Sequence, residues 1–414
     1  MLVFTLNKQG KPLMSCSPCK AKRLLRAKKA KVVRTTPFTI KLLYGSTGYK
    51  QGITAGMDTG SKKIGVAAVS ADRILYQSEV ELRNDITKKM KQRLSYRRTR
   101  RGRKTRYRKP RFLNRGKAGF LAPSIKSKIE SHLREKRFTE SILPVSKWIL
   151  ETASFDIHLI TNPSVEKKGY QEGEQKGFYN TKAYILHRDG YKCQKCKKSK
   201  VKLQVHHIIS RSNKGTNEPK NLITLCVDCH EKLHNGDFTI MGSKSKTKHA
   251  TEMGIIKSQL KKRFGEFKEV FGYETKYWRE QVLGLPKTHY NDAISIVCNG
   301  EQEEIKILNN VIYKKHVSRG DYQQTKGNHS EKKIPNSKLF GFKKFDKVKY
   351  NNVLYFIKGR MSSGYAILSN VFGEKVKLKP IPKFSKMERI NARTTTQVAI
   401  HPPPKGRGFL ATTG

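Results

Sequence analysis

Acidic residues are scarce in this sequence. The 414 residues include 32 aspartates and glutamates against 87 lysines and arginines, which gives a formal net charge of +55. A compact protein with this charge would repel itself, so the imbalance predicts a polyanionic partner whose phosphates offset it. The chain also lacks an internal repeat, an apolar run of membrane-spanning length and a signal-like start. These absences exclude a repeat or membrane-spanning protein and argue against secretion.

Apolar residues are nevertheless common enough for buried cores. They make up 36% of the chain, and aromatic residues make up 9%, so a purely disordered basic tail is excluded. The length allows roughly two to four small domains. Seven cysteines, four of them at zinc-site spacing, indicate a reducing compartment. We therefore expect the protein in the cytoplasm or nucleoid of a prokaryote, or in an organelle that encodes it.

The densest set of candidate metal ligands lies in residues 191–234. Two Cys-x-x-Cys pairs, Cys193/Cys196 and Cys226/Cys229, provide four thiolates, which suit a tetrahedral structural Zn²⁺ site. The gap between the pairs is longer than in a zinc ribbon, so we expect a small subdomain inside it.

That subdomain is predicted to be a β-hairpin, residues 201–209 and 222–225, followed by a helix from about residue 228. His206 and His207 are neighbours on the first strand, so their side chains point to opposite faces. One imidazole can hold a metal ion while the other takes a proton from water.

Asn221, His230 and His234 follow, and they add further side chains suited to metal binding and proton transfer. The two histidines are spaced i,i+4, which places both on one helix face. A structural zinc ribbon with incidental histidines is the alternative, but it has no use for these residues in this order. The stretch resembles an HNH nuclease module of the ββα-metal type.

A strongly basic segment precedes this module. Residues 86–129 contain no acidic residue, and more than half of residues 88–117 are lysine or arginine. A helix is predicted as far as Lys109, because Pro110 would end it. Such a helix is stable when phosphates lie along it, and the planar arginine fork suits phosphate oxygens. We predict a nucleic-acid-binding helix; the alternative is a solvated basic linker.

Three acids and a histidine lie at the edges of predicted core elements. They are Asp58 at the end of the first strand of residues 52–82, Glu151 at the end of a strand within residues 143–155, and His289 with Asp292 on the first turn of a helix at residues 287–298. A carboxylate in such a place is costly unless it binds a cation, and together the four residues suit a two-metal phosphodiesterase. Taken singly, the acids also fit a turn, a solvated strand end and a helix start.

The order of these motifs resembles the IscB family of transposon-encoded, RNA-guided nucleases. GMDTG, RRTRR at residues 97–101, ILETASFD, the HNH insertion and THYNDA occur in the family's order. Lys11-Pro12-Leu13-Met14 resembles its PLMP motif, with Ser15 in place of the last proline. The resemblance covers roughly residues 1–300.

The resemblance implies an α/β multidomain fold. Its parts would be an N-terminal PLMP-like domain (1–51), three segments of a split RNase H-like (RuvC) domain (52–85, 113–160 and 253–300), an Arg-rich bridge helix (86–112), an inserted HNH domain (161–252), a linker (301–338), a C-terminal small β-barrel reading a target-adjacent DNA motif (339–393) and a disordered tail (394–414).

The resemblance also implies roles. The RuvC-like site would comprise Asp58, Glu151, His289 and Asp292, with its acids holding two Mg²⁺ ions that serve cleavage of the displaced strand. His207 would be the HNH base that cuts the guide-paired strand. Ligands of an HNH Mg²⁺ would be His206, Asn221 and His230, although Asn221 could instead orient the base. Guide RNA would contact Arg97, Arg98, Arg100, Arg101, Arg103, Arg106 and Arg108.

The implied partners are an omega-type guide RNA and double-stranded target DNA, bound by a monomeric protein, with base pairing supplying specificity. Two alternatives stay open. One is an RNA-free HNH homing or restriction-type endonuclease, and the other is a non-catalytic RNA-binding protein. A third Cys-x-x-Cys, Cys16 and Cys19, has no partner pair and is predicted to mark a helix start.

Overall fold

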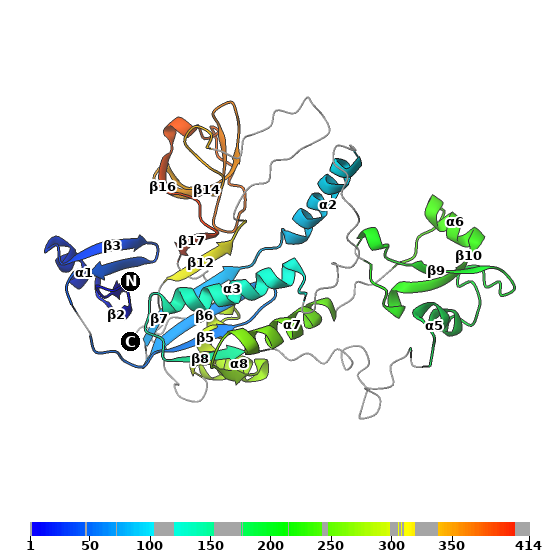
Figure 1. Cartoon of the computed structure of the whole chain (residues 1–414), viewed down its shortest axis with the longest axis horizontal. Coiled ribbons are helices and arrows are strands. Elements are labelled where there is room, and N and C mark those ends of the chain that lie inside the picture. The colour runs from blue at the N-terminus through cyan, green and yellow to red at the C-terminus, as the bar shows by residue number, and fades with distance from the viewer. Residues whose placement is uncertain are drawn as a thin grey trace. The chain divides into compact units, whose positions relative to one another are not determined.

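The computed structural model describes residues 2–45, 48–71, 73–102, 120–152, 175, 177–213, 215–241, 247–298, 305, 308, 310–318 and 338–401, without the side chains of 100–102 and 247–249. The chain forms two compact units: residues 1–153 together with 253–414, and residues 154–252 (Figure 1). This confirms a mixed α/β multidomain chain with an insertion. Within the described ranges, no helix has the length and apolar character needed to cross a membrane.

A seven-stranded mixed sheet forms the centre of the first unit, in the order β11-β8-β5-β6-β7-β12-β17. Its strands are β5 (Thr54–Asp58), β6 (Lys63–Ser70), β7 (Arg73–Glu81), β8 (Lys147–Glu151), β11 (Lys268–Val270), β12 (Val311–His316) and β17 (Thr396–His401). β5, β6 and β7 form an antiparallel meander, whereas β8 pairs in parallel with both β5 and β11. The predicted three-strand segment and the predicted strand ending at Glu151 are therefore both present.

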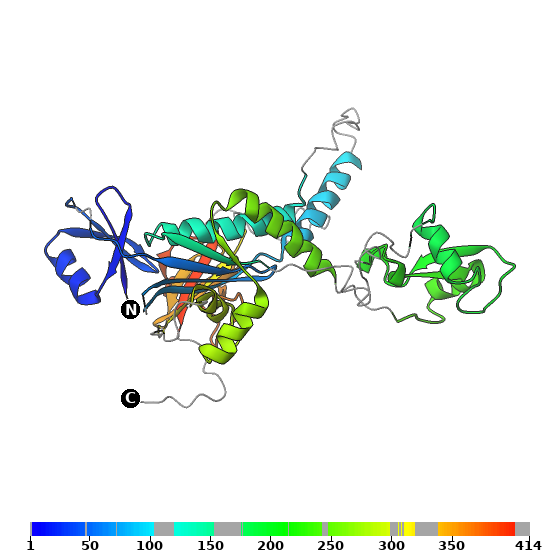
Figure 2. The ribbon, with the colours of Figure 1, turned by 90° about the horizontal axis from the view of Figure 1, so that it is seen from below.

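Alternating apolar side chains give the sheet two buried faces. Val66 and Ala68 belong to a core that includes residues of α3 (Pro123–Glu140) and α7 (Thr247–Arg263). Ala67 and Val69 belong to a second core. That core includes the apolar side of α9 (His289–Cys298), as the pattern of residues 287–298 predicted. Figure 2 shows α3 and α7 together on one side of the sheet.

Two strands lie where the sequence predicted none. β12 falls in the predicted linker, and β17 falls in the predicted disordered tail, so the structure contradicts both predictions there. β12 pairs in parallel with β7, and β17 pairs antiparallel with β12 along its whole length. Their sequences are short and mix apolar with polar residues, so they carry little local signal. Both strands are stabilised by burial between strands that are distant in the sequence.

Smaller sheets lie before and after the central one. The N-terminal sheet has the order β2-β1-β4-β3, and the C-terminal sheet has the order β15-β14-β13-β16. The elements are β1 (Val3–Leu6), β2 (Pro12–Cys16), α1 (Pro18–Arg26), β3 (Ala30–Thr35), β4 (Phe38–Leu42), β13 (Lys347–Tyr350), β14 (Val353–Arg360), β15 (Ala366–Ser369), η5 (Phe384–Lys386) and β16 (Glu388–Asn391). β2 was not predicted. Ser17 caps α1 by accepting from Lys20 N, so Cys16 and Cys19 do flank a helix start.

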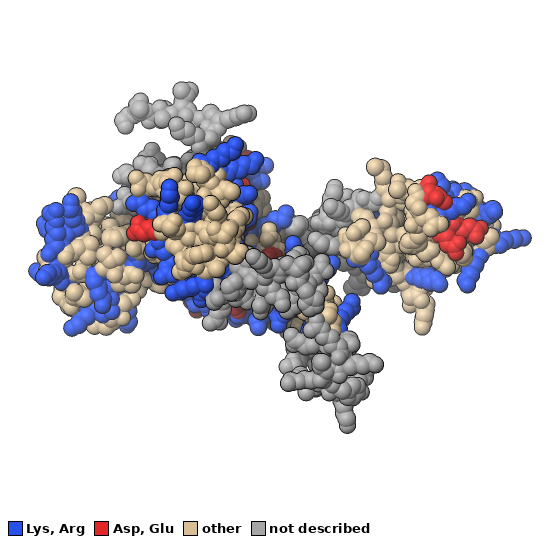
Figure 3. Space-filling view, turned by 90° about the horizontal axis from the view of Figure 1, so that it is seen from above, with Lys and Arg blue, Asp and Glu red and all other residues tan. Residues whose placement is uncertain are grey.

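The basic segment begins as a helix, α2 (Ile86–Gly102). Arg97 and Arg98 are exposed on it. The predicted contacts Arg103, Arg106 and Arg108 lie outside the described residues, as do the side chains of Arg100 and Arg101. In Figure 3, lysine and arginine side chains are dispersed over the visible surface of each unit and outnumber the acidic ones.

The second unit has a ββα core. β9 (Leu203–His207) pairs antiparallel with β10 (Leu222–Cys226), and α6 (Val227–Asn235) follows at once, as predicted. Cys226 Sγ accepts from Cys229 N and caps α6, while Gly236 ends it at φ +90°. Its other described elements include α5 (Thr181–Arg188) and the 3₁₀ turns η2 (Arg211–Asn213) and η3 (Pro219–Asn221).

Candidate active sites

Sheet register brings the first two predicted acids together. Asp58 and Glu151 are paired residues at the ends of the parallel strands β5 and β8. Paired residues on neighbouring strands project to the same face, so both carboxylates lie at one edge of the sheet. Asp58 is buried and Glu151 is half-buried. Thr59 Oγ1 donates to Glu151 O at 2.6 Å and ties the two strand ends.

Two glycines let α9 bring the other predicted residues to this edge. A Cβ on Gly65 would lie 1.7 Å from His289 O, and one on Gly56 would lie 2.6 Å from Ala293 O. Backbone therefore packs directly on backbone, which only glycine permits. Ligand-type atoms of Asp58, His289 and Asp292 lie within 4.8 Å of one another. The structure thus assembles all four predicted residues at one edge.

The groups of this cluster shift one another's pKa values. Burial, reinforced by Asp58 and Asp292, raises the pKa of Glu151 to about 7. Burial also raises the pKa of Asp292. The hydrogen bond to Asp58 raises the pKa of His289. Carboxylates held so close disfavour their shared ionised state unless a positive charge lies between them.

A buried arginine that the sequence did not single out provides part of that charge. Arg279 lies on the π-helical turn η4 (Trp278–Val282), which follows α8 (Gly272–Tyr277). Its guanidinium pairs with Asp292 and Glu280, and its side chain is only 5% exposed. An arginine among the aromatic residues of this stretch was the one available signal. π-helical turns are frequent at functional sites.

The second unit gathers the four cysteines. All four Sγ atoms lie within 4.8 Å of one another, and those of Cys196 and Cys226 lie 3.7 Å apart. Three of the four residues are buried. This clustering of two distant pairs fits the predicted structural Zn²⁺ site.

A separate group of three imidazoles lies on the ββα core. Rings of His206, His230 and His234 have centroids 4.6 to 5.0 Å apart, and one nitrogen from each lies within 4.8 Å of the others. The i,i+4 spacing thus places both helical histidines beside the strand histidine. Partial burial, and after it repulsion from the neighbouring histidines, lowers the pKa of His206. Neutral imidazoles in this arrangement are suited to metal ligation.

His207 points away from that group, as the strand alternation predicted. Its Nε2 lies 2.9 Å from Asn217 Oδ1 and 3.4 Å from Arg211 Nε. Arg211 Nη2 also donates to Asn217 Oδ1 at 3.1 Å. Neither Asn217 nor Arg211 was predicted, although both lie in the polar loop between the hairpin strands.

Asn221 holds this loop. Its Oδ1 accepts from Ile209 N at 2.9 Å, and its Nδ2 donates to Ile209 O and Thr216 O at 3.1 and 2.8 Å. The side chain is buried. With its amide engaged by backbone groups, the geometry favours the positioning role over the metal-ligand role that was predicted for Asn221.

Two family models match parts of this chain. Residues 3–173 match the family described as RRXRR protein, and residues 193–236 match HNH endonuclease. The chain is also 36% identical over 56 residues to Anaredoxin of Nostoc sp. (strain PCC 7120 / SAG 25.82 / UTEX 2576), across 14% of this chain and 74% of that protein. Residues 3–173 therefore match the RRXRR family and residues 193–236 form an HNH endonuclease domain, a combination consistent with an IscB-type protein, and the chain is a metal-dependent DNA endonuclease.

Proposed function

We propose that the protein is an RNA-guided DNA endonuclease with two separate cleavage sites. The observation that supports this best is that one strongly basic chain holds two distinct clusters, Asp58–His289–Asp292 in the first unit and His206–His230–His234 in the second. The HNH site would cut the guide-paired strand, and the acid site would cut the displaced strand.

The order β7-β6-β5-β8-β11 supports a split RNase H-like domain for the first unit. An antiparallel meander is followed by two parallel strands, and the acids lie at the ends of its two central strands, β5 and β8. The meander β5–β7, strand β8 and helix α9 come from widely separated segments of the chain. This separation fits a domain interrupted by a helix and an inserted module.

The residues of the acid site fit hard divalent cations. Asp58, Glu151 and Asp292 offer carboxylate oxygens, the ligand type that Mg²⁺ prefers. When bound, such ions stabilise the charge that develops on the scissile phosphate and its leaving oxygen. His289 contacts Asp58 through Nδ1, and its imidazole would take or give a proton at the reacting group.

At the HNH site, His207 would take the proton of the attacking water. Asn217 fixes the orientation of its ring, and Arg211 lies beside it as a phosphate contact. Asn221 keeps the loop in place. This division of labour assigns proton transfer to one strand face and metal binding to the other.

The ligand set of the HNH site favours a different metal from the Mg²⁺ predicted. His206, His230 and His234 offer three imidazoles, and imidazole suits zinc and other transition metals better than magnesium. We propose a transition metal there, held by these three residues. The four-cysteine group would hold a separate structural Zn²⁺.

We propose guide RNA as the partner of α2. Its exposed Arg97 and Arg98 belong to the acid-free segment, residues 86–129. The C-terminal sheet is the proposed reader of the target-adjacent DNA motif, and a monomer bound to one RNA is the proposed assembly.

Strand-specific cleavage tests the proposal. The gene is expressed with its native flanks, RNA that stays bound through a moderate-salt wash is sequenced, and guided cleavage is assayed with each DNA strand labelled separately. Asp58→Ala is expected to abolish cleavage of the displaced strand only, and His207→Ala to abolish cleavage of the guide-paired strand only. His187→Ala, a histidine outside the site, is the matched control.

Other outcomes would contradict the proposal. Loss of both cuts in either variant, with DNA binding intact, would overturn the division of labour. DNA cleavage that ribonuclease treatment does not affect would instead favour an RNA-free HNH endonuclease.

A further inference from the structure

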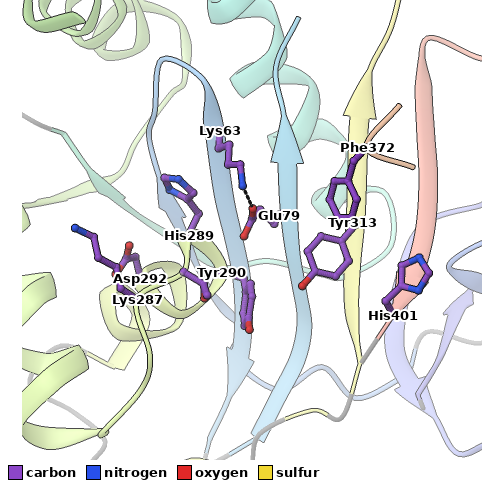
Figure 4. Close-up of a pocket in the computed structure, with 10 residues that line it drawn as sticks. Lys63, Glu79, Lys287, His289, Tyr290, Asp292, Tyr313, Phe372 and His401 are labelled. Carbon is purple, nitrogen blue, oxygen red and sulfur yellow. Dashed lines mark hydrogen bonds and ion pairs between the residues drawn. The ribbon is translucent and has the colours of Figure 1, made fainter. Parts of the chain in front are cut away.

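A cavity of about 620 Å³ extends from the acid site across the sheet (Figure 4). His289 and Asp292 line one part of it, and Tyr313, Phe372 and His401 line another. Its size is that of a typical small-molecule pocket and is large enough for a nucleotide. Because it shares residues with the proposed active site, whatever fills it lies next to the reacting groups.

The cavity crosses four neighbouring strands. Lys63 is on β6, Glu79 on β7, Tyr313 on β12 and His401 on β17, in the order that these strands have in the sheet. Three inter-strand spacings of about 4.8 Å give a span of ~14 Å. That span accommodates a base together with the phosphates on its two sides. It is wider than a metal ion with its bound waters needs.

Aromatic rings form the wall away from the acids. The rings of Tyr313 and Phe372 lie 5.3 Å apart at 69°, and those of Tyr313 and His401 lie 6.2 Å apart at 45°. Phe372 is 38% exposed although the residue before it, Val371, is buried. The Phe372 carbonyl accepts from Lys315 Nζ, so the backbone that carries this exposed ring is anchored.

Charges at the cavity suit a phosphodiester strand. Lys287 is exposed at its rim near the acids. The carboxylate of Glu79 is bound by Lys63 Nζ at 2.6 Å, so the acid in the floor is paired. Lysines beside an aromatic wall are the combination with which proteins bind single-stranded nucleic acid.

We propose that this cavity binds one nucleotide of the single DNA strand that the acid site cuts, with its base against Phe372 and His401 and a flanking phosphate near Lys287. The inference rests on the proposed function of the acid site. Stacking on aromatic rings tolerates any base, which suits an enzyme whose sequence choice is made elsewhere.

Fluorescence of 2-aminopurine tests the proposal. The probe is a short single-stranded DNA with 2-aminopurine at successive positions, titrated at moderate salt against full-length protein carrying Asp58→Asn to suppress cutting. Stacking is expected to quench one position more than its neighbours. Phe372→Ala should abolish that difference and weaken binding roughly fivefold to hundredfold, whereas Phe372→Trp should restore it.

Tyr49→Ala is the matched control, because Tyr49 is 89% exposed and lies outside the cavity lining. Thermal unfolding checks that Phe372→Ala remains folded. Quenching and affinity that do not change in folded Phe372→Ala would overturn the cavity proposal, even if Asp58→Ala still removed one strand's cleavage. In the converse outcome, quenching depends on Phe372 while Asp58→Ala leaves cleavage of both strands unchanged. That result would support the cavity proposal and refute the proposed active site.

Discussion

His289 Nδ1 lies 2.6 Å from Asp58 Oδ2, although 231 residues separate them in the chain. The contact depends on Gly65, where a side chain would strike the backbone of His289. A strand near the N-terminus and a helix beyond the inserted unit therefore complete one site. Each unit has its own buried core, yet the acid site forms only when the segments on both sides of the insertion meet.

Metal binding at the acid site should depend on pH. The pKa of Glu151 is raised to about 7, chiefly by burial, and the pKa of His289 is raised by Asp58. A metal ion must displace those protons, so affinity for Mn²⁺ is expected to rise between about pH 6 and pH 8. Calorimetric titration measures this. Glu151→Gln should bind more weakly and with a flatter pH dependence, whereas the exposed-site control Glu266→Gln should match the wild type.

Arg279 should contribute more to the free energy of unfolding when no metal ion is bound than when one is. Arg279→Met leaves Asp292 and its neighbouring acids without their cation, which is expected to cost about 3 kcal/mol of unfolding free energy. Added Mg²⁺ should restore much of that loss, because it supplies positive charge in the same place. Thermal unfolding with and without Mg²⁺ measures both effects. Arg263→Met, which breaks an exposed pair with Glu130, should cost under about 1 kcal/mol and show no such rescue.

Side-chain chemistry made the sites predictable, and distance in the chain made parts of the fold unpredictable. Asp58, Glu151, His206 and His207 were predicted because each is a polar residue on, or at the end of, a strand that the sequence pattern makes clear. β12 and β17 were missed because their stability comes from each other and from β7.

The supporting residues were missed for a related reason. Arg279, Asn217 and Arg211 were not predicted, because their contacts are made with residues that the local sequence pattern does not identify. Asn221 was found by its place in the motif, but its role became visible only through its bonds to the backbone of Ile209 and Thr216.

Removal of one cysteine should unfold the second unit. In Cys193→Ser the remaining three thiolates bind Zn²⁺ less tightly, and the folding energy that the metal supplies is lost. We expect the zinc content to fall by one ion per chain and proteolysis within residues 154–252 to increase. Elemental analysis and limited digestion measure these. Cys19→Ser, an exposed cysteine outside the cluster, should change neither, and unchanged zinc in Cys193→Ser would refute the site.

His132 should make the first unit acid-sensitive. Its side chain is fully buried, with Nδ1 2.8 Å from Lys128 O, and burial lowers its pKa from 6.5 to about 4. The unfolded chain therefore takes up the proton first, so this contribution to stability is complete above pH 6.5 and is lost as the pH falls to 4.

His132→Gln removes that titration. Between these pH values the wild type should lose about 3 kcal/mol more unfolding free energy than the variant. Denaturant unfolding at several pH values measures the difference. The nearby Glu135, whose pKa is lowered to about 2, titrates in a lower window and is common to both proteins. Parallel stability curves would contradict the assignment.

The basic helix should determine how RNA binding depends on salt. Each phosphate that a side chain neutralises contributes to the slope of log affinity against log salt. Replacing four arginines should therefore weaken RNA binding and flatten that slope by roughly 3. The replaced residues are Arg97, Arg98, Arg100 and Arg101. Filter binding at increasing salt measures the slope.

A second set of substitutions separates this effect from simple loss of net charge. Four lysines of the second unit, all exposed, are replaced by glutamine as the control: Lys197, Lys198, Lys200 and Lys202. Both variants lose four positive charges, so a purely long-range effect would lower affinity equally in the two. If α2 binds the RNA directly, only the arginine variant changes the slope, because counterions are released where phosphates are contacted. Equal slopes in the two variants would mean that the RNA lies elsewhere.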